Sequence, residues 1–392
     1  MERPLLLRNG TVCVDGALHA HTDLRIEDGV VAQVGCGLDA HGATAVDVAD
    51  HLVTAGFVDL HIHGGAGVLC EDANPASIRK LSEILPRYGV TGFLPTLAAL
   101  PPRPLHDAVA AIASAHGSEP GATILGIHLE GPFLNPQMAG AQNPHWMRAP
   151  SVAELDALQA AAGGLIRLIT LAPEIDGALP FIAAARQRGI AISIGHTAAT
   201  GACVGDAIAA GATHVTHLFN AMRPLHHREP GPIGTALTDE RLSVELICDG
   251  HHVAPSAVDL TWRCKAADKV VLVSDAVAVD LADGSYEMFG SQCLISGGTI
   301  RLAIDGTLAG STLGLDRAVR NLHTWLPRVG LLELLATVSS SPAAVIGMAD
   351  ASRIRVGGPA NLTVLDRELH VAMTVCRGVL ASRSTMQLNH RE

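Results

Sequence analysis

The segment Thr123–Phe133, TILGIHLEGPF, ends an apolar run on a carboxylate. Its isoleucines and leucines are typical of a buried strand, and Glu130, followed by glycine and proline, marks the end of that strand. A carboxylate in this position is costly to bury unless a positive charge meets it. Two later apolar runs end in His196 and His217, and a glutamate with two histidines is a ligand set for a divalent metal ion. The segment therefore predicts a metal centre where several strands end.

Strand-like and helix-like runs alternate along the middle of the chain. The expected strands are 53–61, 90–97, 123–129, 166–171, 190–196, 212–217, 243–249 and 270–275. The expected helices include 75–87, 104–115, 152–161, 178–188, 201–210 and 255–267, and a β-hairpin is expected at 284–310. Eight β/α units predict an α/β fold, a (β/α)8 barrel of the TIM type. The alternative, a doubly wound open sheet, usually carries a glycine-rich phosphate loop, and no G-x-G-x-x-G follows these strands.

Both ends of the chain have the short apolar runs and turns of β-structure. Near the N-terminus, Asn9-Gly10 and Asp28-Gly29 are hairpin signals. Neither end is long enough to bury a sheet by itself. We therefore expect residues 1–52 and 350–392 to form one small β-sandwich domain, with 53–349 as the barrel domain. Two separate end domains are the alternative.

Composition restricts the class of protein. Hydrophobic residues make up 48% and charged residues 17% of the 392, which is enough for a large core. The net charge of −11 argues against nucleic-acid binding. The chain lacks the apolar run of about 18 residues that predicts a membrane span, and its N-terminus lacks a signal-peptide pattern. The eight cysteines are scattered without a CxxC pair, which predicts reduced thiols and a cytoplasmic protein.

Further polar residues lie at the expected strand ends, which converge on one face of a barrel. His61 and His63 come at the first strand end, Asp249 at the seventh and Asp275 at the eighth. Because alternate side chains of a strand share a face, both histidines are expected to bind metal. The alternative is that one of them packs against the barrel floor or bonds to a backbone carbonyl. For Asp275 the alternative is a helix N-cap.

The motif FVDLHIH resembles the opening of the amidohydrolase superfamily. The longer motifs HLEGPFLNP, IGHTAAT, THLFNAMRPLHHREPG, ICDGHHV, LVSDA and LAGSTLGLDRAVRN resemble one branch of it, the N-acetylglucosamine-6-phosphate deacetylases. The resemblance covers most of the barrel and its flanking sandwich. Many binuclear amidohydrolases bridge their metals with a carboxylated lysine at a strand end. None of Lys80, Lys265 and Lys269 lies at such an end, so Glu130 is expected to take that place.

The ligand types predict how the site acts on water. An ion held by Glu130, His196 and His217 leaves one position for a water molecule, whose pKa falls toward neutrality. The resemblance assigns Asp275 as the general base that takes a proton from this water and returns it to the leaving amine. It also allows a second ion at the His-x-His pair. We therefore expect one or two divalent ions per subunit, zinc before iron.

Ten residues match substrate-binding positions of the resembled family. They are Ala141, Gln142, Asn220, Ala221, Arg228, Asp249, His252, Leu308, Ala309 and Gly310. Arg228 suits a phosphate because its guanidinium is planar and permanently charged, and the alternative is a surface salt bridge with Glu229. Gln142 departs from the family, in which a histidine commonly polarises the acetyl carbonyl. An amide can donate a hydrogen bond there but cannot carry positive charge.

The resemblance predicts hydrolysis of N-acetyl-D-glucosamine 6-phosphate to D-glucosamine 6-phosphate and acetate, a step of amino-sugar catabolism. Because members of the resembled family are commonly homodimers, it also predicts a homodimer. The alternatives within enzymes are the galactosamine epimer as substrate, or a cyclic-amide hydrolase or deaminase that acts on an unphosphorylated substrate. An alternative of another class is a non-catalytic barrel with a structural metal or a sensor role.

Overall fold

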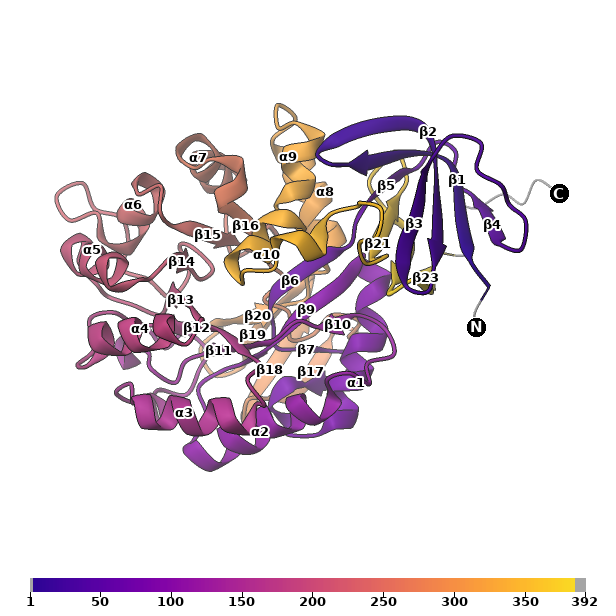
Figure 1. Ribbon diagram of the computed structural model, residues 1–392. Helices are drawn as coiled ribbons and strands as arrows, with labels where there is room; N and C mark the ends of the chain where they lie inside the picture. Colours follow the sequence, from indigo (N-terminus) through magenta and orange to yellow (C-terminus); the bar gives the residue numbers. More distant parts are fainter. Residues whose placement is uncertain (1–2, 385–392) are drawn as a thin grey trace.

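A barrel of parallel strands forms the centre of the computed structural model, which describes residues 3–384 (Figure 1). The barrel strands are β6 (Phe57–Ile62), β9 (Val90–Leu97), β11 (Ile127–Glu130), β12 (Ile166–Leu171), β13 (Ala191–Ile194), β14 (His214–Val215), β15 (Ser243–Leu246) and β16 (Val270–Leu272), hydrogen-bonded in that order. A parallel bridge between Ile62 and Ala276 joins the end of the first strand to the segment that follows the last one. The predicted (β/α)8 barrel is confirmed.

Nearly all residues of the barrel strands are buried, on both faces of each strand, as is typical of a parallel sheet covered by helices. The predicted strand 123–129 is divided into β10 (Thr123–Ile124) and β11. At the break the Leu125 amide donates to the Phe93 carbonyl, while the Ile127 amide donates to the Leu165 carbonyl. The chain thus changes pairing partner between these two residues. Gly126 permits the change, because a Cβ atom there would lie 2.7 Å from the Arg167 side chain.

Helices surround the barrel (Figure 1). They are α1 (Pro75–Ile84), α2 (Pro102–Ala115), α3 (Val152–Ala161), α4 (Ala178–Gln187), α5 (Gly201–Ala210), α6 (Gly231–Thr238), α7 (Pro255–Cys264), α8 (Leu315–Trp325), α9 (Leu331–Ala336) and α10 (Ser340–Val345). The bounds of α3 and α5 are those predicted, because Ser151 and Thr200 cap the N-termini of these helices with their hydroxyls. The predicted helix 75–87 instead continues as the 3₁₀ helix η2 (Leu85–Tyr88).

The two chain ends share one sheet beside the barrel, and both ends of the drawn ribbon lie there in Figure 1. Its strands are β1 (Leu5–Val14), β2 (Ala17–Glu27), β3 (Val30–Gly35), β4 (Thr44–Asp47), β5 (Leu52–Ala55), β21 (Leu362–Leu365), β22 (Val371–Cys376) and β23 (Val379–Arg383). The sheet order is β23-β22-β21-β5-β1-β2-β3, with β4 paired to β1. The pairing of β5 with β21 therefore joins the N-terminal and C-terminal segments. Residues 385–392 of the second segment lie outside the described residues.

Two details of this sheet differ from the prediction. Asn9-Gly10 lies inside β1, where the pairing with β2 shifts register, and is an irregularity in the strand and not a hairpin turn. The predicted strand 53–61 is two strands, since β5 belongs to the end sheet and only β6 belongs to the barrel. The turn at Asp28-Gly29 does connect β2 to β3, as predicted. The division into domains at residues 52/53 and 349/350 stays a prediction.

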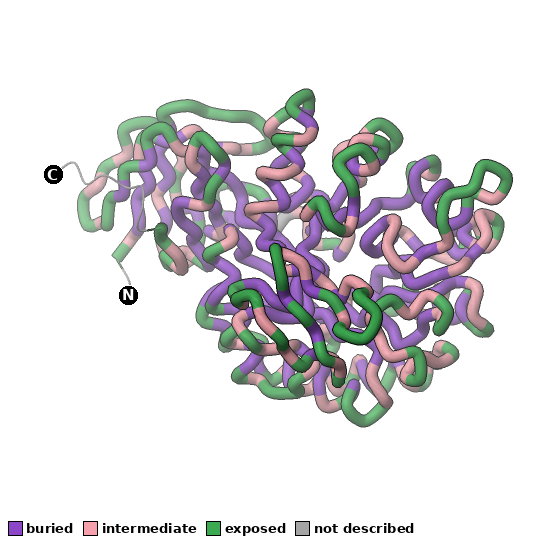
Figure 2. Tube along the Cα trace, turned by 180° about the vertical axis from the view of Figure 1, so that it is seen from behind, coloured by how far each residue is buried: buried purple, intermediate pink, exposed green. Residues whose placement is uncertain are grey.

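A small antiparallel sheet lies between the last barrel strand and α8. It consists of β17 (Gly284–Met288), β18 (Ser291–Ser296), β19 (Thr299–Leu302) and β20 (Leu308–Ser311), where the sequence predicted a hairpin. The short strands β7 (Gly64–Gly65) and β8 (Val68–Leu69) pair with each other after β6. Figure 2 shows buried backbone through the barrel and exposed backbone in the outer loops. Among the described residues no helix is long and apolar enough to cross a membrane.

Candidate active site

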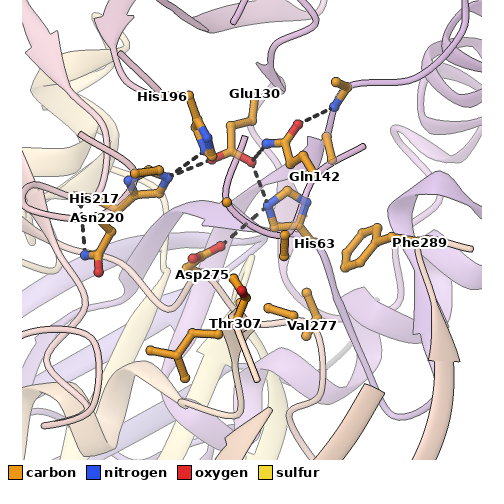
Figure 3. A pocket seen from close by; sticks show the side chains of 18 of the residues that line it. His63, Glu130, Gln142, His196, His217, Asn220, Asp275, Val277, Phe289 and Thr307 are labelled. Carbon is orange, nitrogen blue, oxygen red and sulfur yellow. Dashed lines mark hydrogen bonds and ion pairs between the residues drawn. The ribbon is translucent and has the colours of Figure 1, made fainter. Parts of the chain in front are cut away.

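Glu130, His196 and His217 converge at the carboxyl ends of the barrel strands, as predicted. Glu130 is the last residue of β11, and the two histidines follow β13 and β14. Oε1 of Glu130 lies 3.0 Å from Nε2 of His196 and 2.9 Å from Nε2 of His217, and the two Nε2 atoms are 3.1 Å apart. All three side chains are buried. Figure 3 shows both imidazoles turned toward the Glu130 carboxylate.

A second group of candidate ligand atoms lies on the other side of Glu130. The Nε2 atoms of His61 and His63 are 3.2 Å apart. Oδ1 of Asp275 lies 3.4 Å from the first and 3.5 Å from the second. Oε2 of Glu130 is 3.3 Å from Nε2 of His63, so this carboxylate stands between the two groups. The structure thus contains two sets of three residues with the spacing of metal ligands.

The backbone turns sharply at three of these residues. His196, His217 and Asp275 have φ values of 47°, 29° and 48°, in the left-handed region that side chains other than glycine rarely adopt. Such a conformation costs on the order of 1–3 kcal/mol and persists where the surrounding structure enforces it. Here each turn follows the end of a buried strand and directs the side chain over the barrel mouth.

The lone pairs of His196 and Glu130 are placed to bind a cation. Nδ1 of His196 lies 2.8 Å from the Met138 carbonyl and must donate to it, so Nε2 of the neutral ring carries a lone pair. That lone pair faces Oε1 of Glu130, which is also an acceptor. Two acceptors at this distance repel unless a positive charge lies between them. Imidazole and carboxylate are the ligand types that zinc and iron take in proteins.

The same need for positive charge is visible in the pKa values. Burial disfavours the charged form of His61, but the carboxylates of Asp275, Glu130 and Glu245 outweigh it and raise its pKa well above the ordinary range. Burial likewise opposes charging of His63, yet Glu130 and Glu71 raise its pKa to about 10. Burial would raise the pKa of Glu130, but the neighbouring histidines hold it well below its usual value.

A cavity of about 350 Å³ opens over the two groups (Figure 3). It is lined by five of the predicted catalytic and metal-binding residues: His63, Glu130, His196, His217 and Asp275. Eight of the ten predicted substrate residues also line it, namely Ala141, Gln142, Asn220, Ala221, His252, Leu308, Ala309 and Gly310. Residues from many separate loops therefore surround one space of a size that suits a small ligand.

Three predicted residues do not line the cavity. His61 is fully buried behind it. Asp249 accepts a 2.7 Å hydrogen bond from Nδ1 of His252 and so holds a lining residue from behind. Arg228 is exposed, and its guanidinium lies 2.9 Å from Nε2 of His227, while Glu229 accepts hydrogen bonds from the Gly201 and Gly231 amides. The suggested salt bridge between Arg228 and Glu229 is not among the ion pairs of the described residues.

Gln142 is held at both ends of its amide group. Its Oε1 accepts a 2.8 Å hydrogen bond from the Ala99 amide, and its Nε2 donates a 2.6 Å bond to Oε2 of Glu130. One of its two N–H groups is therefore committed to the candidate ligand carboxylate. This arrangement explains how glutamine is accommodated at the position where a histidine was expected by resemblance.

The sequence reasoning missed several residues of the site. Glu71 and Glu245 contact the histidine pair through Nδ1. Arg301 of β19 lines the cavity, and Phe289 packs edge-on against the His63 ring with centroids 5.8 Å apart. The glutamate in SVELICDG was a detectable signal, because a charged residue inside an apolar strand needs a partner. The position of Arg301 depends on how the small sheet folds over the barrel.

A family model for amidohydrolases matches residues 52–381. The chain belongs to the amidohydrolase family. This amidohydrolase is 39% identical over 371 residues to an N-acetylgalactosamine-6-phosphate deacetylase of Escherichia coli O157:H7, covering 94% of this chain and 96% of the relative. It is 36% identical over 389 residues to the N-acetylglucosamine-6-phosphate deacetylase of Bacillus subtilis (strain 168), covering 97% and 98%.

Solved structures agree with this assignment. A mutant N-acetyl-D-glucosamine-6-phosphate deacetylase of Mycobacterium smegmatis, in complex with N-acetyl-D-glucosamine 6-phosphate, superposes with a TM-score of 0.91 and 32% identity over 97% of this chain and all of that one. The N-acetylglucosamine-6-phosphate deacetylase of Thermotoga maritima gives 0.87 and 30% over the same shares. This amidohydrolase is thus a metal-dependent amide hydrolase by family, with a divalent ion as its cofactor.

Proposed function

We propose that this protein hydrolyses N-acetyl-D-glucosamine 6-phosphate to D-glucosamine 6-phosphate and acetate. The observation that carries the proposal is the placement of Glu130 between two histidine pairs on the floor of the cavity. The relatives and the M. smegmatis complex support the substrate class. The galactosamine epimer is the second candidate, because the E. coli relative is named for it.

The reaction breaks the amide C–N bond and forms a C–O bond from water. A bound divalent ion supplies a Lewis acid that makes water a stronger acid and polarises the acyl oxygen. Glu130, His196 and His217 would hold one ion, and His61 and His63 a second. Asp275 takes the proton of the attacking water on its carboxylate and returns it to the amine nitrogen as that nitrogen leaves.

The remaining residues would bind the sugar phosphate. His252 and Asn220 lie at the cavity wall, and Gln142 holds Glu130 in place with an N–H directed at its carboxylate. Arg228 is exposed and does not line the cavity of its own chain, so we propose that it contacts the phosphate bound by a second subunit. We therefore keep the homodimer as part of the proposal. Light scattering during size-exclusion chromatography measures the mass in solution, and a monomer would remove Arg228 from the site.

The metal and the compartment are proposed on chemical grounds. Zinc is the first choice because the ligands are imidazole and carboxylate, and iron is the second. The eight cysteines are free thiols, which supports a reducing compartment such as the cytoplasm. Metal analysis of the purified protein distinguishes zinc from iron.

An acetate-release assay on three sugars tests the function. N-acetylglucosamine 6-phosphate should react fastest, its galactosamine epimer more slowly, and unphosphorylated N-acetylglucosamine least. Preference for the epimer would replace the substrate assignment by the second candidate. Equal turnover of the unphosphorylated sugar would contradict phosphate recognition, and no acetate with any metal would favour a non-catalytic role.

Two arginine variants identify the phosphate contact. Arg228→Ala should raise KM for the phosphorylated sugar about tenfold or more, because a charge-assisted hydrogen bond to the phosphate is lost. Arg301→Ala is the matched variant on the cavity wall. If only the second variant raises KM, the phosphate is held by Arg301 and the role given to Arg228 is wrong.

A further inference from the structure

Each histidine of the His-x-His pair has its own buried carboxylate behind it. Nδ1 of His61 lies 3.0 Å from Oε2 of Glu245, and Nδ1 of His63 lies 3.3 Å from Oε1 of Glu71. Glu245 is fully buried, and the Glu71 side chain is 9% exposed. Neither glutamate lines the cavity, so neither is placed to contact a substrate there.

These contacts determine which ring nitrogen faces the site. A carboxylate accepts, so Nδ1 of each imidazole must donate to it, and Nε2 of the neutral ring then carries the lone pair. The two Nε2 atoms are the ones that converge, 3.2 Å apart, beside Oδ1 of Asp275. The glutamates therefore select the tautomer and the ring orientation that a cation requires.

The histidines of the other pair, His196 and His217, have no carboxylate at Nδ1 in the described part of the chain. Nδ1 of His196 donates to the neutral carbonyl of Met138, and Nδ1 of His217 is buried without a hydrogen-bond partner among the described residues. A carboxylate partner makes an imidazole a stronger metal ligand than a neutral partner does. The two candidate ion positions thus differ in the groups behind their histidines.

We infer that Glu71 and Glu245 are positioning residues that enable the His61/His63/Asp275 group to hold a second divalent ion. The inference rests on the metal binding in the proposed function and does not depend on the substrate.

The two glutamates differ in the histidines that they contact. Oε1 of Glu71 accepts from His63 and from the Ala98 amide, so Glu71 serves the His-x-His pair alone. Oε2 of Glu245 also accepts a 3.0 Å hydrogen bond from the His217 amide. Its Oε1 is fixed by Nε2 of His214, whose Nδ1 meets the Ser243 hydroxyl. Removing Glu71 should therefore affect one ion position, and removing Glu245 should affect both.

Zinc titration of the metal-free full-length protein tests the inference. Calorimetry and metal analysis should give two zinc ions per wild-type chain. Glu71→Gln keeps an oxygen in place but removes the charge, and should weaken one of the two sites about tenfold. Glu71→Ala removes both the oxygen and the charge. It should weaken zinc binding at the same site about a hundredfold and leave the other site unchanged. Glu245→Gln should weaken both sites.

Two controls separate positioning from a general effect on folding. Glu119→Gln changes another buried carboxylate, which accepts from the Ile124 amide outside the site, and should leave both zinc affinities unchanged. His63→Ala should lose one zinc ion, and adding Glu71→Gln to it should have no further effect on zinc binding, because the two residues act as one unit.

The outcomes are distinct from those of the activity assay. Wild-type zinc affinities at both sites of Glu71→Ala would overturn the inference, and so would a wild-type chain that binds one zinc ion only. Two zinc ions in the wild type and one in Glu71→Ala, without acetate release from any sugar, would support the inference while the proposed function fails.

Discussion

Asp275 lies beside the His-x-His pair on a strained backbone. Its φ of 48° places Oδ1 within 3.5 Å of both histidines of the His-x-His pair, and its amide donates to the His61 carbonyl. The sequence alternative of a helix N-cap does not apply, since β16 is followed by the small sheet and not by a helix.

Asp275→Asn should abolish most of the proton transfer without changing the shape of the side chain. We expect kcat for acetate release to fall by about 10²- to 10⁴-fold, the usual contribution of a general base. Circular dichroism checks that the variant folds. Unchanged acetate release would exclude Asp275 as the base.

The Asp249–His252 pair predicts a pH dependence of substrate binding. Burial disfavours the charged imidazole, but the hydrogen bond and charge of Asp249 raise the pKa of His252 above its ordinary value of 6.5. Since the folded pKa is raised, the positive charge is present at low pH and is lost as the pH rises through the raised value. KM for the phosphorylated sugar should therefore increase, by about tenfold, toward high pH.

Asp249→Asn supplies the comparison for this profile. Without the carboxylate the pKa of His252 falls, so the increase in KM should begin at a lower pH than in the wild type. KM measured from pH 6 to pH 9 with both proteins decides the matter. Identical profiles would show that the charge of His252 does not contribute to binding.

At the scale of elements, the packing at the end of β13 leaves no space for a side chain at Gly195. A Cβ atom there would lie 2.7 Å from Thr170 and 2.9 Å from Thr216, both fully buried. These threonines hydrogen-bond to each other at 2.7 Å inside the barrel, and Thr170 also meets His128. The close packing at this residue precedes the turn at His196.

Gly195→Ala should lower the free energy of unfolding by about 1–3 kcal/mol, the cost of overpacking a core. It should also weaken zinc binding at Glu130, because His196 is the next residue. Urea unfolding measures the first effect. Gly205→Ala is the control, since it lies in α5 with open space around its Cβ position, and should stabilise by about 0.5–1 kcal/mol. Equal effects at both glycines would contradict this packing argument.

For the whole molecule, two buried threonines join the end sheet to the barrel. The hydroxyl of Thr363 donates to the Gly89 carbonyl and that of Thr374 to the Pro86 carbonyl, each at 2.7 Å. Both threonines are fully buried. Gly89 and η2 immediately precede β9, so these bonds connect the C-terminal strands β21 and β22 to the start of a barrel strand.

Thr374→Val should lower the free energy of unfolding by about 1 kcal/mol, the net value of one hydrogen bond, while its volume is kept. Thr374→Ser retains the hydroxyl and should lose less of the stability that this hydrogen bond supplies. Urea unfolding of the three proteins gives the comparison. A valine variant as stable as the wild type would show that the bond contributes nothing to the contact.

Removal of the metal should lower the stability of the entire chain. An ion that binds only the folded state stabilises it by about 4 kcal/mol at a thousand times its Kd. Chelation should therefore lower the melting temperature and stop acetate release, and added zinc should restore both. A melting temperature that does not respond to chelation would contradict metal binding at the barrel mouth.

The sequence by itself determined the barrel and indicated the six residues of the two candidate ligand groups. Apolar runs of strand length, separated by helical runs, can be buried only between layers of helices, so the order of elements specified the fold. Glu130, His196, His217 and Asp275 were recognisable because each ends such a run. The motif resemblance located eight further residues that line the cavity.

Only the tertiary structure decided which residues stand behind the ligands. Glu71 and Glu245 lie 8 and 184 positions in sequence from the histidines they contact. No local sequence pattern links residues at these separations. Asn9-Gly10 was misread for a similar reason, since pairing with β2 over a long strand overrides a local turn signal. Local sequence records propensity and burial, whereas these contacts arise only when the closed barrel brings separate strand ends together.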